Sequence, residues 1–263
     1  MRTLLGSAVA ALALTACSGA GSVAVAPAGP YAGQITLTSL PDGWSMQANF
    51  TTAEAADAGV CPGATIGACC VFSQPQWVIA DGDSVPPVVG AGTLTVADGD
   101  KSLATASFAG YGYHPISSSE SSAPGWSPGD VLSLSAAGSA VDSFSGSVVA
   151  PPAFTAVSPQ LSPTEISVVR LSTDLQLSWS PADGYAGSVT AQLFDVNGFY
   201  VTCSGPDAAG SLTLPLETFA NFAAADTGTL TLSRADSVSI QTLNATVNLS
   251  AVSAASGNVT FLP

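Results

Sequence analysis

Two short acidic motifs in this sequence contain the residue types that could bind a metal ion. Asp81-Gly82-Asp83 and Asp98-Gly99-Asp100 stand 17 positions apart. Carboxylate oxygens are the ligands that calcium prefers, but Asp-Gly is first of all a dipeptide of tight turns. Neither motif continues into the full loop with a distant bidentate glutamate. We therefore expect two turns and no metal ion or other cofactor, with calcium at these four aspartates as the alternative.

A second candidate site surrounds His114, the one histidine of the chain. Tyr111, Tyr113 and Trp126 are near it in the sequence, and aromatic rings offer flat apolar faces on which a sugar ring can stack. Loops at the ends of a β-sandwich are common binding sites. These four residues form a candidate ligand surface for a glycan, and the alternative is ordinary packing at the end of a sandwich.

Catalytic constellations are hard to find in the sequence. A serine hydrolase needs a histidine to activate its serine, and His114 is the one histidine of the chain, so this class has little support. No glycine-rich phosphate loop or dinucleotide fingerprint indicates nucleotide binding. A carboxylate pair of the glycosidase type has no sequence signature, so that class stays open. We expect a protein that is not an enzyme, with no catalytic residues and no nucleotide.

The cysteines indicate a disulfide. The chain has five of them, Cys17, Cys61, Cys69, Cys70 and Cys203. Disulfides form in the oxidising compartment that an exported chain enters. Adjacent residues of a strand point to opposite faces, so Cys61 can bond to Cys69 or to Cys70 but not to both. Cys203 alternates in its strand with the same period as Phe199 and Val201, so we expect it on the buried side as a free thiol. A second disulfide that includes Cys203 is the alternative.

The N-terminus has the pattern of an export signal. A short positive region, Met1-Arg2, precedes an apolar stretch, Leu4–Leu14, that is too short to span a bilayer as a stable helix. The stretch ends in Leu14-Thr15-Ala16-Cys17. This sequence resembles the lipobox of bacterial lipoproteins at every position. The alternative is an ordinary signal peptide, with the cysteine incidental.

The lipobox resemblance implies a lipid anchor. By this resemblance, residues 1–16 are a signal peptide that is removed, and Cys17 is the site of lipid attachment. Acyl chains would then hold the protein in a lipid bilayer, and two or more chains make such anchoring stable. Residues 17–30 are rich in Gly, Ala, Ser and Pro and predict a flexible tether. Ser18 follows the cysteine, which by the same resemblance favours the outer membrane over the inner membrane.

The composition excludes some partners. The 263 residues include 4 basic and 18 acidic ones, and the net charge is −14. Nucleic acids need Lys and Arg to neutralise their phosphates, so we expect no nucleic-acid partner. The acidity is typical of a soluble surface that adheres to little else. The expected partner beyond the bilayer is therefore an unknown envelope protein or a glycan.

The elements that would position these residues are β-strands. In the stretch from Trp126 to Pro152, apolar residues alternate with serines on both sides of a glycine-containing turn, which predicts two strands with one buried face. Pro151-Pro152 then ends the pairing. In the second half, Asn197-Gly198 is a strong hairpin signal. Leu216 to Ala223 has the spacing of one or two helical turns.

The pattern as a whole predicts an all-β protein. We expect two antiparallel immunoglobulin-like sandwich domains in tandem, at residues 31–152 and 153–263, after the signal peptide and tether. The lipobox, Pro128-Gly129-Asp130, the segment from Phe144 to Pro152 and the strand from Leu175 to Trp179 resemble a set of uncharacterised bacterial lipoproteins with such domains. The resemblance implies fold and location, and it implies no activity. The function that we expect is a non-catalytic, membrane-anchored spacer or protein-interaction module. A glycan- or calcium-binding surface module is the alternative.

Overall fold

A computed structural model of the chain describes residues 29–40, 43–52, 61–73, 87–110, 112–117, 125–162, 164 and 166–263. The described part is built of β-strands and two short 3₁₀ turns, so the predicted all-β fold is confirmed. Within this part, no helix is long and apolar enough to cross a membrane. The lipobox, with Cys17, and the tether up to residue 28 lie outside the described residues.

The strands fall into one large sheet and two small ones. The large sheet has ten strands, and the small sheets have four and three. The strands of the large sheet are β1 (Tyr31–Leu40), β2 (Gly43–Thr52), β3 (Ala64–Ile66), β4 (Cys69–Ser73), β7 (Ile116–Ser117), β11 (Ile166–Arg170), β13 (Ser188–Asp195), β14 (Phe199–Pro206), β16 (Thr227–Gln241) and β17 (Ala245–Leu262). The four-stranded sheet contains β5 (Leu94–Asp98), β6 (Lys101–Ala106), β8 (Val131–Ala136) and β9 (Phe144–Val149). The three-stranded sheet contains β10 (Val157–Ser158), β12 (Leu175–Trp179) and β15 (Ser211–Leu214).

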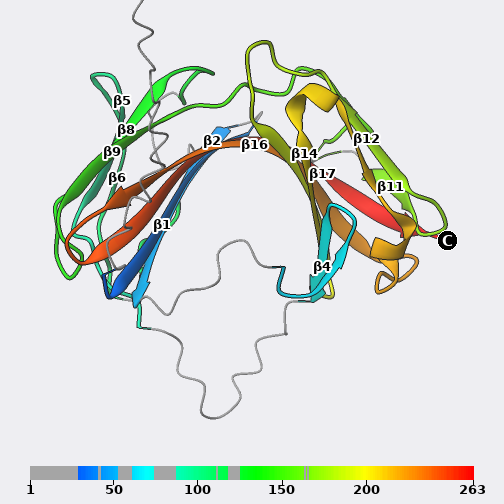
Figure 1. Ribbon diagram of the computed structural model, residues 1–263, viewed down its shortest axis with the longest axis horizontal. Helices are drawn as coiled ribbons and strands as arrows, with labels where there is room; N and C mark the ends of the chain where they lie inside the picture. The colour runs from blue at the N-terminus through cyan, green and yellow to red at the C-terminus, as the bar shows by residue number, and fades with distance from the viewer. Residues whose placement is uncertain are drawn as a thin grey trace, which may run out of the picture.

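The long hairpin of β16 and β17 is the spine of the molecule. It pairs over 15 positions, and the large sheet curves into an arch around it (Figure 1). Ala245 to Ala251 of β17 contribute to one hydrophobic core, and Val259 and Phe261, further along the same face, contribute to the second. The four-stranded sheet covers the first core and the three-stranded sheet covers the second. Both cores therefore lie on one side of a single sheet, which makes two sandwich-like lobes.

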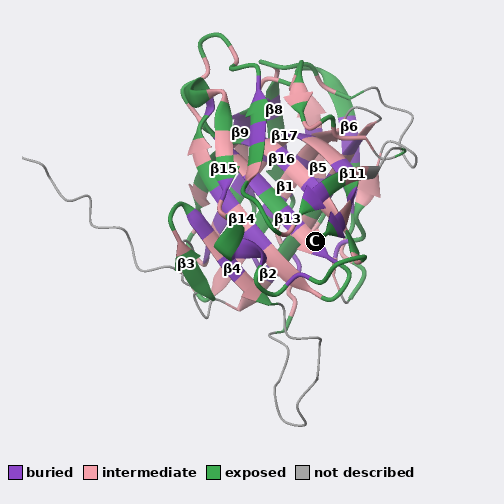
Figure 2. Cartoon of the chain, turned by 90° about the vertical axis from the view of Figure 1, so that its right-hand side faces the viewer, coloured by how far each residue is buried: buried purple, intermediate pink, exposed green. Residues whose placement is uncertain are grey.

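Burial follows the alternation that the sequence shows. Leu132, Leu134 and Ala136 of β8 are buried, and the residues between them are exposed. Figure 2 shows the same interleaving of buried and less buried residues along several strands. The predicted strands on both sides of the turn are thus confirmed, because one face of each strand lies on the first core.

Strand pairing links the two halves of the sequence. β1 pairs with β17 in parallel, and β4 pairs with β14. Each of these pairs joins a strand before residue 152 to one after it, so both lobes contain strands from both halves. The division into residues 31–152 and 153–263, and the immunoglobulin-like type of the sandwiches, stay predictions.

The segment from Leu216, where the sequence predicts one or two helical turns, forms a short 3₁₀ helix, η2 (Leu216–Phe219). Its Thr218 hydroxyl donates to the carbonyl of Pro215 at 2.6 Å, and Phe219 and Phe222 pack into the second core. The other 3₁₀ turn, η1 (Asp207–Ala209), follows β14. It begins with a buried aspartate that has no counterpart among the sequence predictions.

This aspartate pairs with an arginine where the two cores meet. Arg234 lies on the core side of β16, between Leu232 of the second core and Val238 of the first. Its Nη1 donates to the carbonyls of Pro152 and Ala153 at 3.3 and 2.8 Å. The connection between β9 and β10 is thereby fixed to the spine at this point.

Candidate functional site

Among the described residues, no sheet covers the side of the ten-stranded sheet that lies opposite the two cores, and we call this side the uncovered face. In Figure 1 it lines the inner side of the arch. Along β17, the residues that alternate with the core residues are half-buried or exposed, and Asn248 and Asn258 are exposed. Along β13, Gln192 is exposed between two buried neighbours. The uncovered face therefore runs through both lobes.

The strand registers arrange polar side chains on this face in rows. In the first lobe, Asn49 is opposite Gln34, Gln34 is opposite Asn248, and Asn248 is opposite Ser239. In the second lobe, one row runs through Thr202, Gln192, Thr231 and Ser256. Amide and hydroxyl groups in such rows can donate and accept hydrogen bonds. The rows predict a surface that binds through neutral polar contacts.

Charge is nearly absent from the uncovered face. On β1, β2, β4, β13, β14, β16 and β17, none of the described residues with this orientation is Asp, Glu, Lys or Arg. Arg170, at the end of β11, is the one charged residue that points to the uncovered face on the described part of the sheet. With a net charge of −14 over the chain, a surface so poor in carboxylates indicates a distinct role for this face.

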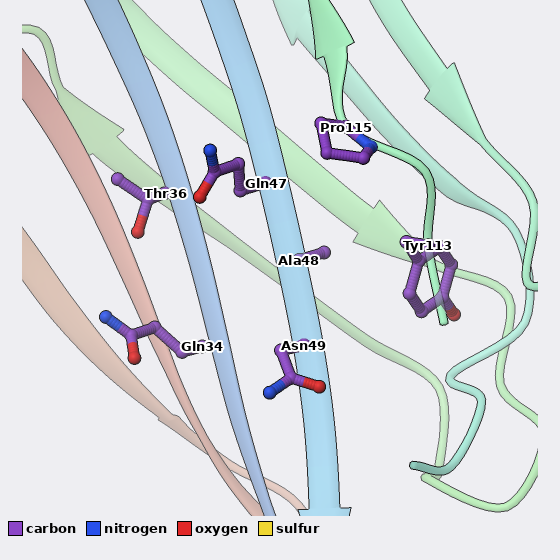
Figure 3. Close-up of a pocket in the computed structure, with 7 residues that line it drawn as sticks. All are labelled: Gln34, Thr36, Gln47, Ala48, Asn49, Tyr113 and Pro115. Carbon is purple, nitrogen blue, oxygen red and sulfur yellow. The ribbon is translucent and has the colours of Figure 1, made fainter. Parts of the chain in front are cut away.

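A depression of about 300 Å³ lies over β1 and β2 in the first lobe. Its lining contains Gln34, Thr36, Gln47 and Asn49 of the uncovered face. Figure 3 shows these polar side chains spread along β1 and β2, with Tyr113 and Pro115 on a segment beyond the edge of β2. The depression presents amide groups and a hydroxyl, which can donate and accept hydrogen bonds.

Tyr113, a predicted ligand-surface residue, is a core residue. Its hydroxyl donates to the carbonyl of Gly92 at 2.6 Å and accepts from the N–H of Ala91 at 2.9 Å. Burial raises the pKa of this hydroxyl above 10.0, and the bond from Ala91 acts in the opposite direction. The ring packs against Phe50 and Phe108 at centroid distances of 5.8 and 5.5 Å. Tyr113 stabilises the first core instead of offering a free ring.

The rest of the predicted ligand surface does not form one platform in the described residues. The half-buried ring of Trp126 packs against the buried Trp44 at 5.8 Å between centroids. His114 is exposed. Tyr111 lies outside the described residues. The grouping of all four residues stays a prediction.

The acidic motif that lies in the described residues, Asp98-Gly99-Asp100, is at the turn between β5 and β6. Asp98 ends β5, and Lys101 begins β6 and pairs with it at 3.8 Å. Asp100 is exposed in the turn between the two strands. Asp81 and Asp83 lie outside the described residues, and among the described ones no group of three or more His, Cys, Asp or Glu could hold a metal ion.

Two disulfides fasten the edge of the second lobe. Cys61 is bonded to Cys70, one of the two partners that the sequence left open. Cys69 is bonded to Cys203, so the expectation of a free thiol at Cys203 is wrong. The pairing of β4 with β14 explains the second bond, because it places Cys69 directly opposite Cys203 on the core side. The bonds indicate an oxidising compartment.

The disulfides border a second depression, of about 600 Å³. Thr202 and Ser204 of the uncovered face lie in its lining, together with Thr65 of β3. Phe72 also lines it, and this ring belongs to an aromatic row with Tyr200 and Phe194 on the neighbouring strands. The depression therefore combines hydroxyl groups with an aromatic ring.

None of these three aromatic residues is among the site residues that the sequence predicts. One signal was available for two of them: Asn197-Gly198 indicates a hairpin, and with its loop centred on Asn197 the two strands place Phe194 opposite Tyr200. No local signal pairs Phe72 with Tyr200, because the two residues are 128 positions apart in the chain. Only the assembled sheet brings the row together.

Comparisons with known proteins leave the family open. No protein-family model matches the chain, and no curated protein matches it. A solved structure from work on the host cell surface retention of a 1.5-MDa bacterial ice-binding adhesin is similar over 88% of this chain, at 10% identity. The match spans 65% of that structure's chain, and its TM-score is 0.20. A score this low does not support a common fold or a common function.

Proposed function

We propose that the chain is a non-catalytic, lipid-anchored envelope lipoprotein that works as a spacer and interaction module, similar to bacterial lipoproteins with immunoglobulin-like sandwiches. The lipobox at Cys17 supports the anchor, and the two disulfides are consistent with export. Residue Ser18 favours the outer membrane over the inner membrane. The partner is an envelope component, either a protein or a glycan.

The observation that carries this proposal is the uncovered face. It extends through both lobes, it is almost free of charge, and its polar residues stand in register across neighbouring strands. A spacer needs only a rigid body, which the continuous β16–β17 hairpin supplies. A spacer would not require ordered rows of amide and hydroxyl groups on its surface. They support a binding role for the uncovered face.

Site-specific photocross-linking of the full-length protein in cells tests the binding role. A photoreactive residue replaces Asn248, an exposed residue of the uncovered face. The matched control replaces Ser135, an exposed residue on the outer side of β8. We expect a discrete cross-linked species from position 248 and none from position 135. Equal cross-linking at the two positions, or none at position 248, would contradict the proposal.

A further inference from the structure

We infer that the depression beside the Cys61–Cys70 disulfide binds a ring of an uncharged glycan, and that Phe72 is the platform on which the sugar stacks. The inference rests on the proposed function, because it names the class of partner for one part of the uncovered face. It is carried by three observations: an aromatic row whose outer ring lines the depression, a neutral lining among the described residues, and two disulfides that join the strands around it.

The aromatic row crosses three strands. Phe72 of β4 is directly opposite Tyr200 of β14, and Tyr200 is directly opposite Phe194 of β13. The rings of Phe72 and Tyr200 are stacked, with centroids 5.1 Å apart and planes 5° from parallel. Tyr200 and Phe194 have centroids 4.6 Å apart. One face of the Phe72 ring is therefore held against Tyr200, which fixes its orientation.

A glycine lies next to Phe72, the outer residue of the row. Gly63 lies beside Phe72, and a Cβ built on Gly63 would be 2.1 Å from the carbonyl oxygen of Val71 and 2.8 Å from the Cβ of Phe72. Since real Cβ atoms do not approach so closely, position 63 accepts only glycine without a shift of the backbone. The position next to Phe72 thus has no side chain, and the ring lines the depression.

The other lining groups suit a neutral ligand with many hydroxyls. Thr65, Thr202 and Ser204 bring hydroxyl groups, each of which can donate and accept. The Oγ atoms of Ser204 and Thr190 lie 3.0 Å apart, which extends this polar set along the uncovered face. Among the described residues that line the depression, none is charged. An anionic glycan or a phosphate would require Arg or Lys, so the chemistry favours an uncharged sugar.

The disulfides make the depression a fixed feature. Cys61–Cys70 joins the segment before β3 to β4, and Cys69–Cys203 joins β4 to β14. Both bonds touch β4, the strand that carries Phe72. The volume of about 600 Å³ lies within the range of small-ligand sites. A rigid site loses little conformational entropy when a ligand binds, which favours affinity.

Affinity electrophoresis of the full-length protein in a polyoxyethylene detergent tests the inference. The gels contain one of four neutral polysaccharides (dextran, mannan, a mixed-linkage β-glucan or a galactan) or the anionic alginate. We expect one neutral polysaccharide to retard the protein and alginate to have no effect. Phe72→Ala should weaken the affinity of the protein for the retarding polysaccharide by roughly tenfold. Ser135→Ala, a change at an exposed residue on the outer side of β8, is the control and should bind like the wild type.

A second variant covers the case in which Phe72→Ala fails to fold. Ser204→Arg fills the depression with a long cation and leaves the aromatic row intact, and it should abolish retardation while the thermal melt stays cooperative. Several results would overturn the inference: no retardation by any of the four neutral polysaccharides, equal retardation by alginate, or wild-type binding by a folded Ser204→Arg variant. If position 248 cross-links to a protein and no polysaccharide binds, the proposed function stands and this inference falls.

Discussion

Arg234 and Asp207 form an ion pair that is fully buried at the point where the two cores meet. Nε and Nη2 of the arginine donate to the same carboxylate oxygen, Oδ1, at 2.9 and 2.7 Å. The other carboxylate oxygen accepts from the N–H of Ala182 at 2.8 Å. The ring of Phe154 lies 4.2 Å from the guanidinium carbon. Every polar atom of the pair has a partner, as a buried charge requires.

Loss of this arginine is expected to destabilise the whole fold. Arg234→Ala leaves the Asp207 carboxylate buried without its counter-charge and frees the carbonyls of Ala153 and Ser180. The expected loss is about 3–5 kcal/mol in the free energy of unfolding. Denaturant titration of the full-length protein measures it. A loss below about 1 kcal/mol would contradict the role that we assign to the pair.

A double variant separates charge from shape. In Arg234→Met with Asp207→Asn, the remaining group is neutral and the Asn oxygen can still accept from Ala182. This variant is expected to recover part of the stability that Arg234→Ala loses, because no unpaired charge stays buried. If it were less stable than Arg234→Ala, the desolvated carboxylate would not be the main cost.

Asp236 predicts a pH dependence of stability. Burial raises the pKa of its carboxyl above the ordinary value of 3.8. A group whose pKa is raised by folding lowers stability when it ionises, so stability is lost as the pH rises from 3.8 through the folded-state pKa. Asp236→Asn should therefore be more stable than the wild type at neutral pH, with a difference that shrinks toward pH 3.8. Thermal melts across this range measure the effect, with Asp183→Asn as an exposed control. A constant difference at all pH values would contradict it.

The two disulfides should contribute unequally. Cys69–Cys203 closes a loop with a sequence separation of 134 residues, and Cys61–Cys70 closes one of 9. The chain-entropy model then predicts losses of about 5 and about 3 kcal/mol when each pair is replaced by serine. Denaturant titrations of the two double-serine variants compare them. A larger loss from the short loop than from the long one would contradict this ranking.

The lipid anchor gives a prediction that does not depend on the folded part. Cys17→Ser removes the attachment site and should release the protein from the membrane fraction or leave it unprocessed. Fractionation of cells, followed by mass determination of the protein, measures both outcomes. A Cys17→Ser protein of mature length that still needs detergent for extraction would show that the lipobox interpretation is wrong.

Local pattern was enough to predict much of the fold. The alternation in β8 and β9 identifies two strands and their buried side, because each lies on one core. The Asn197-Gly198 signal identifies the hairpin of β13 and β14. The parallel pairing of β1 with β17 could not be found in the same way. It joins residues more than 200 positions apart, and no turn between them leaves a local signal.

The site was harder to predict than the fold, for physical reasons. Arg234 lies in a strand rich in Thr and Ser, and an isolated arginine in such a strand is expected to be exposed. Arg234 is buried because the two lobes pack around it. Tyr113 looked like a binding residue because its neighbours are aromatic, but its hydroxyl satisfies two backbone groups of another segment. Cys203 was assigned the correct face, and its partner was missed because strand order decides the bond.

The central claim, that the uncovered face is the binding surface, is tested most directly by hydroxyl-radical footprinting. Oxidation rates of the full-length protein are compared between cells that express it and the purified protein in detergent. We predict that Phe72, Phe194 and Tyr200 become protected in cells. Val131 and Val149, which are exposed on the outer side of the four-stranded sheet, should react equally in both samples. Protection of those two valines with no protection of the three aromatic residues would contradict the claim.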